Sequence, residues 1–386
     1  MPGTALQNFT DFVKFTGPAY FTSPDKFLNE AAKRTYVLSR FLKGKGLDKT
    51  IQSGASIKDD VMFDEARTFQ NYKPNAEFTW TQPQVATEQE IDWRFSIDHM
   101  SWTDHEITLN MNSGFSREYA QVQYKKLRKK IEQRMWTSMI NGMEERLIYG
   151  NQAAVDAEAA DGGDQYSLLS LITEDTTNYH NASGSWTTIM GIDPATQDKW
   201  RNQVETYDYD DSDDSDGDGD GLIDAFDNML TKVQWVAPDF HKEHFESSSN
   251  DEHARQFIGC SRGGLNQYKR LLRAANDTLV RKQDASYNRP QFDGMDLVYI
   301  SQMDTVQHVW NTNTTAAVET SYTTDGYRYL WLNGNYITPV FHNERYFFKK
   351  DPFFLEKQPY TWVSPVDCWW NVFCQSRQRQ GIVAPQ

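Results

Sequence analysis

The chain has 386 residues, enough for two or three domains, and 14% of them are aromatic, which excludes a disordered chain. With 39 basic and 54 acidic side chains, its net charge of −15 argues against tight, sequence-independent binding to nucleic-acid phosphates. The longest apolar runs are too short to cross a bilayer, and the first residues lack the pattern of a secretory signal.

Residues 1–54 are predicted to form an N-terminal arm with one short helix. Pro24 and Asp25 precede KFLNEAAKRTYVLSRFLKG, in which apolar residues recur at helical spacing, and Gly44 ends the pattern. The helix also carries several basic side chains. A solvated face explains them better than a contact with nucleic acid.

Residues 55–112 are predicted to form an extended β-ribbon. The stretch EFTWTQPQVATEQEIDWRFSID alternates apolar and polar residues, with QPQVATEQ as the connection between two strands. Its apolar face consists of Phe78, Trp80, Ile91, Trp93, Phe95 and Ile97. A lone two-stranded ribbon is marginal in water, and burying each large apolar side chain is worth about 2 kcal/mol. We therefore expect this face to be covered, either by its own domain or by a neighbouring subunit.

Residues 115–149 are predicted to form one long helix, because apolar residues step by three and four through the segment. These residues are Tyr124, Leu127, Ile131, Met135 and Met139. About 33 residues at about 1.5 Å each make a rod of about 50 Å. Basic residues fill the other faces. They could contact phosphate, or they could face solvent and pair with Glu132, Glu144 and Glu145.

Beyond Gly150, segments typical of helices and strands follow one another without regular alternation. LIDAFDNMLTKVQWV is typical of a helix, and HARQFIGCSRGGLNQYKRLLRAAN of a strand, a turn and a helix. Further strands are predicted in PQFDGMDLVYIS, in YRYLWLNGNYITPVF and in the C-terminal segment YTWVSPVDCWWNVFCQSRQRQGIV. This order predicts an α+β fold.

The sharpest local motif is acidic, with ten aspartates between residues 208 and 227. It fits the calcium-loop pattern D-x-[DN]-x-[DN]-G-x5-[ED], with ligands from Asp216, Asp218, Asp220, Leu222 (through its carbonyl), Asp224 and Asp227. Aspartate at the last position reaches less far than glutamate, and no clear helix precedes the loop. We therefore expect a single dockerin-like loop that binds a structural calcium ion; a solvated acidic loop is the alternative.

Residues 259–263, GCSRG, fit the G-x-S-x-G pattern of a serine-hydrolase nucleophile elbow, with a strand before and a helix after. The candidate triad is Ser261 with Asp296 or Asp304 and with His308 or His342. The preceding half of the chain lacks the doubly wound series of strands and helices that such hydrolases require. The simpler interpretation is that Ser261 caps the following helix.

The histidines and cysteines do not form a recognisable metal site. His241, His244 and His253 lie in a polar segment with no further ligand at fitting spacing, which favours surface histidines over zinc. Cys260, Cys368 and Cys374 form no CxxC pair and cannot all be joined by disulfides. We expect buried free thiols, which suit a reducing cytoplasm.

The order of these elements resembles the major capsid proteins of tailed bacteriophages. Several stretches resemble segments of one branch of that family, among them GIDPATQDKWRNQV, LIDAFDNMLTKV, FIGCSRGGLNQYKRLLRAAND, FDGMDLVYISQMD and CWWNVFCQSRQRQGIV. The likeness extends over nearly the whole chain from about residue 55. One departure is Asp193-Pro194, where that branch has an arginine at the second position. The aspartate-rich loop is a second departure and resembles an insertion.

The resemblance implies a domain order. It assigns 1–54 to an N-terminal arm, 55–112 to an extended loop, 113–205 to a peripheral domain with spine helix 115–149, 206–325 to an axial domain with the Asp-rich loop 208–227, and 326–386 to a return to the peripheral domain. Calcium would then brace the boundary of the axial domain. A neighbouring subunit would cover the ribbon.

The resemblance also implies a structural protein and not an enzyme. Hexamers and pentamers of the chain would form an icosahedral head, assembled in the host cytoplasm and located in the virion. The head would enclose double-stranded DNA, held weakly on its inner face. The implied partners are scaffold, portal and decoration proteins, and no membrane. Two alternatives stay open: a serine hydrolase using Ser261, and a calcium-dependent adhesion or docking module.

Overall fold

The computed structural model describes residues 37–42, 50–51, 54–63, 71, 86–103, 105, 117–148, 165–174, 188–208, 221–233, 256–275, 290–304 and 326–386. These residues fall into two compact units. Unit 1 contains the described parts of Phe95–Met143 and His342–Trp369. Unit 2 contains those of Thr35–Arg94, Glu144–Phe341 and Trp370–Gln386. Helices and strands are mixed in the chain, which confirms the predicted α+β class.

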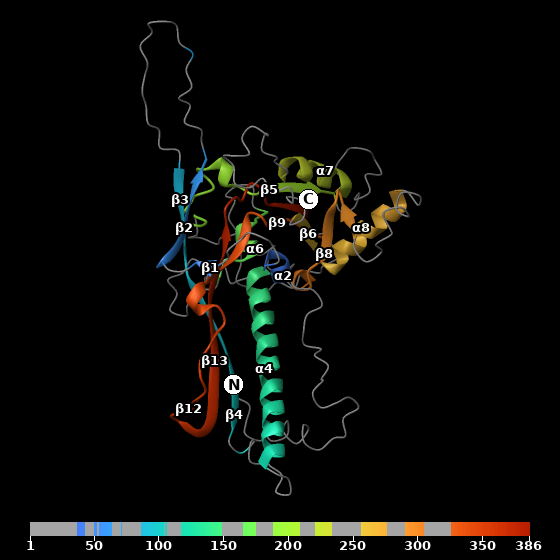
Figure 1. Cartoon of the computed structure of the whole chain (residues 1–386). Helices are drawn as coiled ribbons and strands as arrows, with labels where there is room; N and C mark the ends of the chain where they lie inside the picture. The colour runs from blue at the N-terminus through green and yellow to red at the C-terminus, as the bar shows by residue number, and fades with distance from the viewer. Residues whose placement is uncertain are drawn as a thin grey trace. The chain divides into compact units, whose positions relative to one another are not determined.

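A six-stranded sheet forms the centre of unit 2 (Figure 1). Its order is β5 (Gln203–Tyr207), β14 (Gly381–Pro385), β9 (Tyr329–Asn333), β6 (Gln256–Cys260), β8 (Met295–Tyr299) and β7 (Gln291–Phe292). The pairs β5–β14 and β6–β8 are parallel, and β9 is antiparallel to both its neighbours. The last strand of the chain is therefore inserted beside one that begins nearly 180 residues earlier.

Both faces of this sheet are covered, since all five residues of β9 are buried. On one face lie α7 (Leu222–Val233) and α8 (Arg262–Ala275). Phe226 of α7 contacts Tyr268 of α8 with ring centroids 5.8 Å apart and Trp331 of β9 at 5.5 Å. On the other face, Phe41 of α2 (Val37–Leu42) contacts Phe257 at 5.6 Å.

The β7–β8 hairpin shows how local sequence sets the register of the sheet. Its strands join through Asp293 and Gly294, which both have positive φ, 44° and 80°. A two-residue turn of this kind matches the twist of the strands and favours glycine at its second position. The predicted strand FDGMDLVYIS thus becomes a short hairpin, whose second strand β8 also pairs parallel with β6.

Smaller elements complete unit 2. Strand β2 (Ser56–Met62) pairs antiparallel with β3 (Ala86–Asp92), and α6 (Leu168–Leu171) and the 3-10 turn η1 (Asp198–Trp200) follow along the chain. Strand β10 (Ile337–His342) pairs with β1 (Thr50–Ile51) and with the last residues of β13 (Gln358–Cys374).

Unit 1 combines a sheet with the long helix. Strand β13 pairs there with β4 (Arg94–Thr103), β11 (Phe348–Lys349) and β12 (Phe353–Leu355), and the short turn η5 (Asn343–Arg345) precedes β11. Helix α4 (Arg117–Ile148) begins in this unit and lies against β11, since Lys349 pairs with Glu132 at 2.5 Å and Trp136 contacts Phe347. Among the described helices, none is both long and apolar enough to span a bilayer.

The long helix predicted over 115–149 is confirmed as α4, a single continuous helix of 32 residues (Figure 1). Met135 and Met139 are buried as the spacing predicts. The predicted ribbon needs a correction, because β3 begins at Ala86, inside the segment expected to be a connection. Its partner is β2, over 56–62, because the register pairs Ile57 with Ile91. Residues 78–80, the expected partner, lie outside the described residues.

Candidate assembly surface

Exposed apolar side chains are concentrated in unit 1. Every large apolar residue that is exposed in the described part of the chain belongs to this unit: Phe95, Ile97, Ile140, Tyr346, Phe348, Phe353, Phe354 and Tyr360. Unit 2 has large aromatic residues too, but Trp200, Tyr207, Phe226 and Trp331 are at most 2% exposed. The two units therefore differ in how far their apolar side chains are covered within one chain.

Three of these residues lie on the side of the unit 1 sheet turned away from α4; we call Phe95, Ile97 and Phe348 the outer apolar face. Lys349 points towards α4, so the side chain of its neighbour Phe348 points to the opposite side. Phe95 contacts Trp369 edge-on at 4.8 Å, and Ile97, two residues further along β4, shares its side. Phe95 is 63% exposed and Ile97 72%.

Trp369 ties this face together. The guanidinium of Arg345 lies 5.4 Å from its ring centre and 5.1 Å from that of Phe348. The indole Nε1 donates to Asp367 Oδ2 at 3.1 Å, and Arg345 pairs with the same carboxylate at 3.7 Å. The neighbourhood of Phe95 and Phe348 is therefore held in place before any partner binds.

The residues predicted to face a neighbouring subunit have different environments. Ile91 and Trp93 are buried by their own chain, and the Trp93 indole donates to the Gly54 carbonyl at 3.0 Å. The prediction that a neighbouring subunit covers the ribbon face is corrected for these two. Phe95 and Ile97 are exposed, while Phe78 and Trp80 lie outside the described residues. The alternation of apolar and polar residues predicts that these side chains share one side of the strand. It does not predict which of them the rest of the chain buries.

The motif residues at the C-terminal end form a buried polar centre in unit 2. Arg377 is completely buried and donates to the Leu171 carbonyl, the Trp200 carbonyl and Asn202 Oδ1 at 2.8, 2.9 and 3.1 Å. Burial lowers the Arg377 pKa to about 10. Asn371 donates to the Asp92 carbonyl and accepts from the Tyr166 amide. These contacts join segments some 175 to 280 residues apart, so the motif stabilises the fold.

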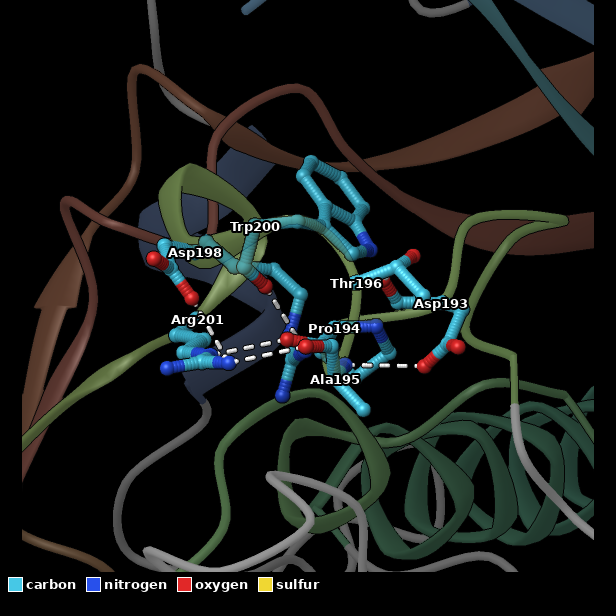
Figure 2. Close-up of polar contacts among 8 residues, drawn as sticks. Asp193, Pro194, Ala195, Thr196, Asp198, Trp200 and Arg201 are labelled. Carbon is cyan, nitrogen blue, oxygen red and sulfur yellow. Dashed lines mark hydrogen bonds and ion pairs between the residues drawn. The ribbon is translucent and has the colours of Figure 1, made fainter.

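The segment GIDPATQDKWRNQV, whose Trp200 carbonyl accepts from Arg377, is held by polar contacts among its own residues (Figure 2). Asp193 Oδ1 accepts from the Ala195 amide at 2.8 Å, and the Asp193 carbonyl accepts from the Thr196 hydroxyl. Arg201 donates to the Pro194 and Ala195 carbonyls and pairs with Asp198 at 2.7 Å. Pro194, at the position where the resembled branch has arginine, therefore contributes its carbonyl to a compact turn.

Glu144 is a structural residue that sequence reasoning misplaced. It was expected on a solvated face of the long helix, but it is fully buried. Its carboxylate accepts the backbone amides of Val37 at 2.6 Å and Leu38 at 2.9 Å, the first two residues of α2. An anion is favourable at the free amides that begin a helix. No local signal marks this contact, because its partners are about 107 residues away.

The candidate calcium ligands are only partly described. Asp216, Asp218 and Asp220 lie outside the described residues. Leu222 begins α7 and is buried, Asp224 is half-buried, and Asp227 is exposed in the second turn of the helix. Within the described residues, no group of three or more potential ligands is arranged to hold a metal ion. The calcium site stays a prediction.

The GCSRG motif has a structural explanation. Ser261 is 2% exposed, and its Oγ accepts the Gly264 amide at 3.3 Å, so it caps α8 as the simpler interpretation predicted. A Cβ on Gly259 would lie 2.5 Å from Ile300 Cδ1, and one on Gly263 would lie 2.0 Å from Tyr327 Cε1. Both glycines are therefore required by packing.

The proposed triad partners are engaged elsewhere or lie outside this part of the molecule. Asp304 accepts the Arg262 amide and the Tyr299 hydroxyl at 2.8 and 2.6 Å, and Asp296 accepts the Gln291 amide group at 2.8 Å. His308 is outside the described residues, and His342 belongs to unit 1. No described histidine of unit 2 completes a triad.

The three cysteines are buried free thiols, as predicted. Burial raises the pKa of Cys260 and Cys374 to about 12 and that of Cys368 to about 11. Such thiols are poor nucleophiles and poor metal ligands near neutral pH. The candidate zinc residues His241, His244 and His253 lie outside the described residues.

Comparisons with known proteins identify the fold. No family model matches the chain, and no curated protein matches its sequence. A solved structure titled "Cyanophage A-1(L) capsid asymmetric unit" matches with a TM-score of 0.51 and 10% identity, over 95% of this chain and 97% of that one. Two further solved structures each match with a TM-score of 0.47. One is titled "The capsid of Myoviridae Phage XM1", with 9% identity over 96% of this chain and 100% of that one. The other is titled "Mycobacterium phage Bobi", with 10% identity over 94% of this chain and 95% of that one. The chain has the fold of a tailed-phage capsid protein, which confirms the predicted fold.

Proposed function

We propose that this chain, which has the fold of tailed-phage capsid proteins, is a major capsid protein: a non-enzymatic subunit that assembles with copies of itself into the head of a virion. The single observation that carries the proposal is this fold over nearly the whole chain. A shell is built from extended surfaces between copies, so it needs no pocket of reactive groups.

The distribution of exposed apolar area supports the proposal. Phe95, Ile97 and Phe348 are 63%, 72% and 44% exposed. At about 200 Å² for each side chain, they expose on the order of 350 Å². The largest apolar patch of an ordinary monomer is also about 300–600 Å² and is often functional, whereas a stable pairwise interface needs about 800 Å² per partner. The face is therefore suited to one contact among several in a lattice of copies.

The proposal has finer parts that stay predictions. They are the arrangement as hexamers and pentamers of an icosahedral head, the double-stranded DNA inside it, and the scaffold, portal and decoration partners. A structural calcium ion in the loop 208–227 is a further one. The reading as an adhesion module rests on that loop alone, and the serine-hydrolase reading loses its support because Ser261 is a buried helix cap.

Electron microscopy of the purified protein, alone and with any cognate scaffold protein, tests the proposal. We expect regular shells or ring-shaped capsomers. Small monodisperse particles under every condition would contradict it. An esterase assay on the wild type and on Ser261→Ala gives a second measurement, in which we expect no activity that depends on Ser261.

A further inference from the structure

The exposed side of α8 carries positive charge. Arg262 and Arg270 are exposed and Lys269 is half-buried, and the helix contains no acidic residue. At about 100° per residue, these three positions fall within an arc of about 100°. The buried residues Gly264, Gln267, Tyr268 and Leu271 occupy the opposite side. We call Arg262, Lys269 and Arg270 the basic stripe of α8.

These cations are not neutralised within the part of the chain that the structure describes. Other basic residues there do pair with carboxylates, such as Arg201 with Asp198 at 2.7 Å and Lys349 with Glu132 at 2.5 Å. The stripe forms no such pair with a described carboxylate. Asp304 lies near its first turn, but that carboxylate accepts the Arg262 backbone amide and the Tyr299 hydroxyl.

The same chain contains a segment of opposite character. Residues 208–220 include eight aspartates and no basic residue. We propose that the basic stripe of α8 binds the acidic segment 208–220 of a second copy of this chain. This inference rests on the proposed function, because a shell brings many copies next to one another. The choice of partner rests on charge complementarity.

Helix α7 lies between the attachment points of the segment and α8 of the same copy. The segment is attached at the end of β5, the edge strand, and at the start of α7. Helix α8 packs on β6 and β8, and β6 lies three strands, or about 14 Å, from β5. Helix α7 packs on β5 and β14 and touches α8 through Phe226 and Tyr268. Thirteen extended residues span up to about 45 Å, so the mixed-assembly test below, and not this distance, separates binding within one copy from binding between copies.

Nucleic acid is the other polyanion that a basic helix could meet. The net charge of −15 disfavours it, because the rest of the surface repels phosphate. Identical subunits with this net charge repel one another when they pack side by side. A contact between the basic stripe of one copy and the acidic segment of the next offsets part of that repulsion. The two readings differ in what binds the stripe, so direct binding separates them.

The first test uses the full chain and a synthetic peptide of residues 208–220, in chelator so that no calcium competes for the aspartates. The full chain carries Asp213→Asn, Asp214→Asn and Asp216→Asn, so that its own acidic segment competes less with the peptide for the stripe. Fluorescence anisotropy should show binding that weakens with added salt. Adding Lys269→Glu and Arg270→Glu should weaken it at least tenfold, and the neutral pair Lys269→Gln and Arg270→Gln should weaken it less. The charge-matched control Lys129→Glu with Arg134→Glu, on α4, should not.

The second test uses assembly. A chain with the stripe reversed (Lys269→Glu, Arg270→Glu) and one with the segment reversed should each need about tenfold more protein to form shells. The segment is reversed by Asp→Lys at positions 210, 211, 213, 214 and 216, which changes its charge from −8 to +2. An equimolar mixture should assemble better than either alone, because each variant then meets its complement.

Three results would overturn the proposal: no peptide binding, equal binding by the reversed stripe, or, when the wild type forms shells, no rescue in the mixture. If the reversed stripe no longer binds DNA but still binds the peptide as the wild type does, the stripe is a nucleic-acid contact and the proposal is wrong. If the wild type forms no shells but binds the peptide through the stripe, the proposed function fails while this inference holds.

Discussion

At the scale of single residues, buried polar side chains fix how distant segments of unit 2 meet. Arg377 joins the C-terminal segment to α6 and to η1 through the carbonyls of Leu171 and Trp200. Gln380 adds a second connection, since its side chain both accepts from the Asn333 amide and donates to the Asn333 carbonyl. A buried acceptor without a donor costs about 1–3 kcal/mol, so these side chains select one arrangement of the segments.

Replacing Arg377 should therefore be costly. In Arg377→Met the apolar stem is kept, but the Leu171 carbonyl, the Trp200 carbonyl and Asn202 Oδ1 each lose a donor. We expect about 3–5 kcal/mol of lost stability, measured by thermal or chemical unfolding. The control Gln378→Ala, at the exposed neighbouring position, should change stability by less than about 0.5 kcal/mol. Equal effects of the two substitutions would contradict the role given to Arg377.

The cysteines allow a prediction about pH. Because burial raises the pKa of Cys260 and Cys374 to about 12 and that of Cys368 to about 11, almost no thiolate is present near pH 8. A thiol reagent should label the native protein very slowly at pH 8 and label all three cysteines after denaturation. Labelling of the folded chain should rise only towards pH 11. Rapid reaction of even one thiol at pH 8 would show that its site is open.

At the scale of elements, α4 also stabilises the start of α2. The carboxylate of Glu144, near the C-terminal end of α4, accepts the first two amides of α2. Glu144→Ala removes the acceptor of the Val37 and Leu38 amides. Hydrogen bonds to a charged group are worth about 1.5–3 kcal/mol, so hydrogen exchange at these two amides should accelerate at least tenfold. Glu145→Ala, one residue further along the same helix, serves as the control. Unchanged protection of Val37 and Leu38 would exclude this role for the carboxylate.

The acidic loop is an element whose function the sequence predicts through spacing alone. If it binds calcium, the ion should raise the melting temperature relative to chelator, because it relieves the repulsion among the carboxylates. Asp220→Ala removes a predicted ligand and should abolish the increase. Asp211→Ala, in the same acidic run but outside the pattern, should keep it. If calcium and chelator give the same melting temperature for the wild type, the loop is a solvated acidic segment.

At the scale of the whole molecule, the outer apolar face should control assembly and leave folding unchanged. Phe95→Asp with Ile97→Asp alters two exposed side chains, so the subunit should stay folded with a small change in stability. Shell formation should be lost, since each charge would have to be buried at a contact. Gln133→Asp with Ser138→Asp, at two exposed polar positions of α4 outside the outer apolar face, is the matched control. Normal shells from the double variant would remove this face from the assembly surface.

This substitution is a sharper test than deleting residues 78–97. The deletion would also remove Ile91 and Trp93, which are buried in unit 2, together with all of β3. Loss of assembly would then report a damaged fold. The corrected environments of these residues thus change how the role of the predicted ribbon can be tested.

Local patterns in the sequence determined the elements. Spacing of three and four predicted α4, period two predicted strand β4, and Ser261 before an apolar helix predicted its cap. These features depend on neighbours in sequence, where backbone geometry and side-chain direction leave few choices. The order of the elements, together with short matching stretches, was sufficient to predict the capsid fold.

The tertiary structure alone decided which apolar side chains the chain covers by itself. Trp93 and Phe95 have the same place in the alternating pattern, yet Trp93 is buried beside Gly54 and Phe95 is exposed beside Trp369. It also decided that Glu144 caps a helix and that Arg377 joins distant segments. Each of these outcomes depends on contacts between residues far apart in sequence, and the free energy of such contacts has no signature in a local pattern.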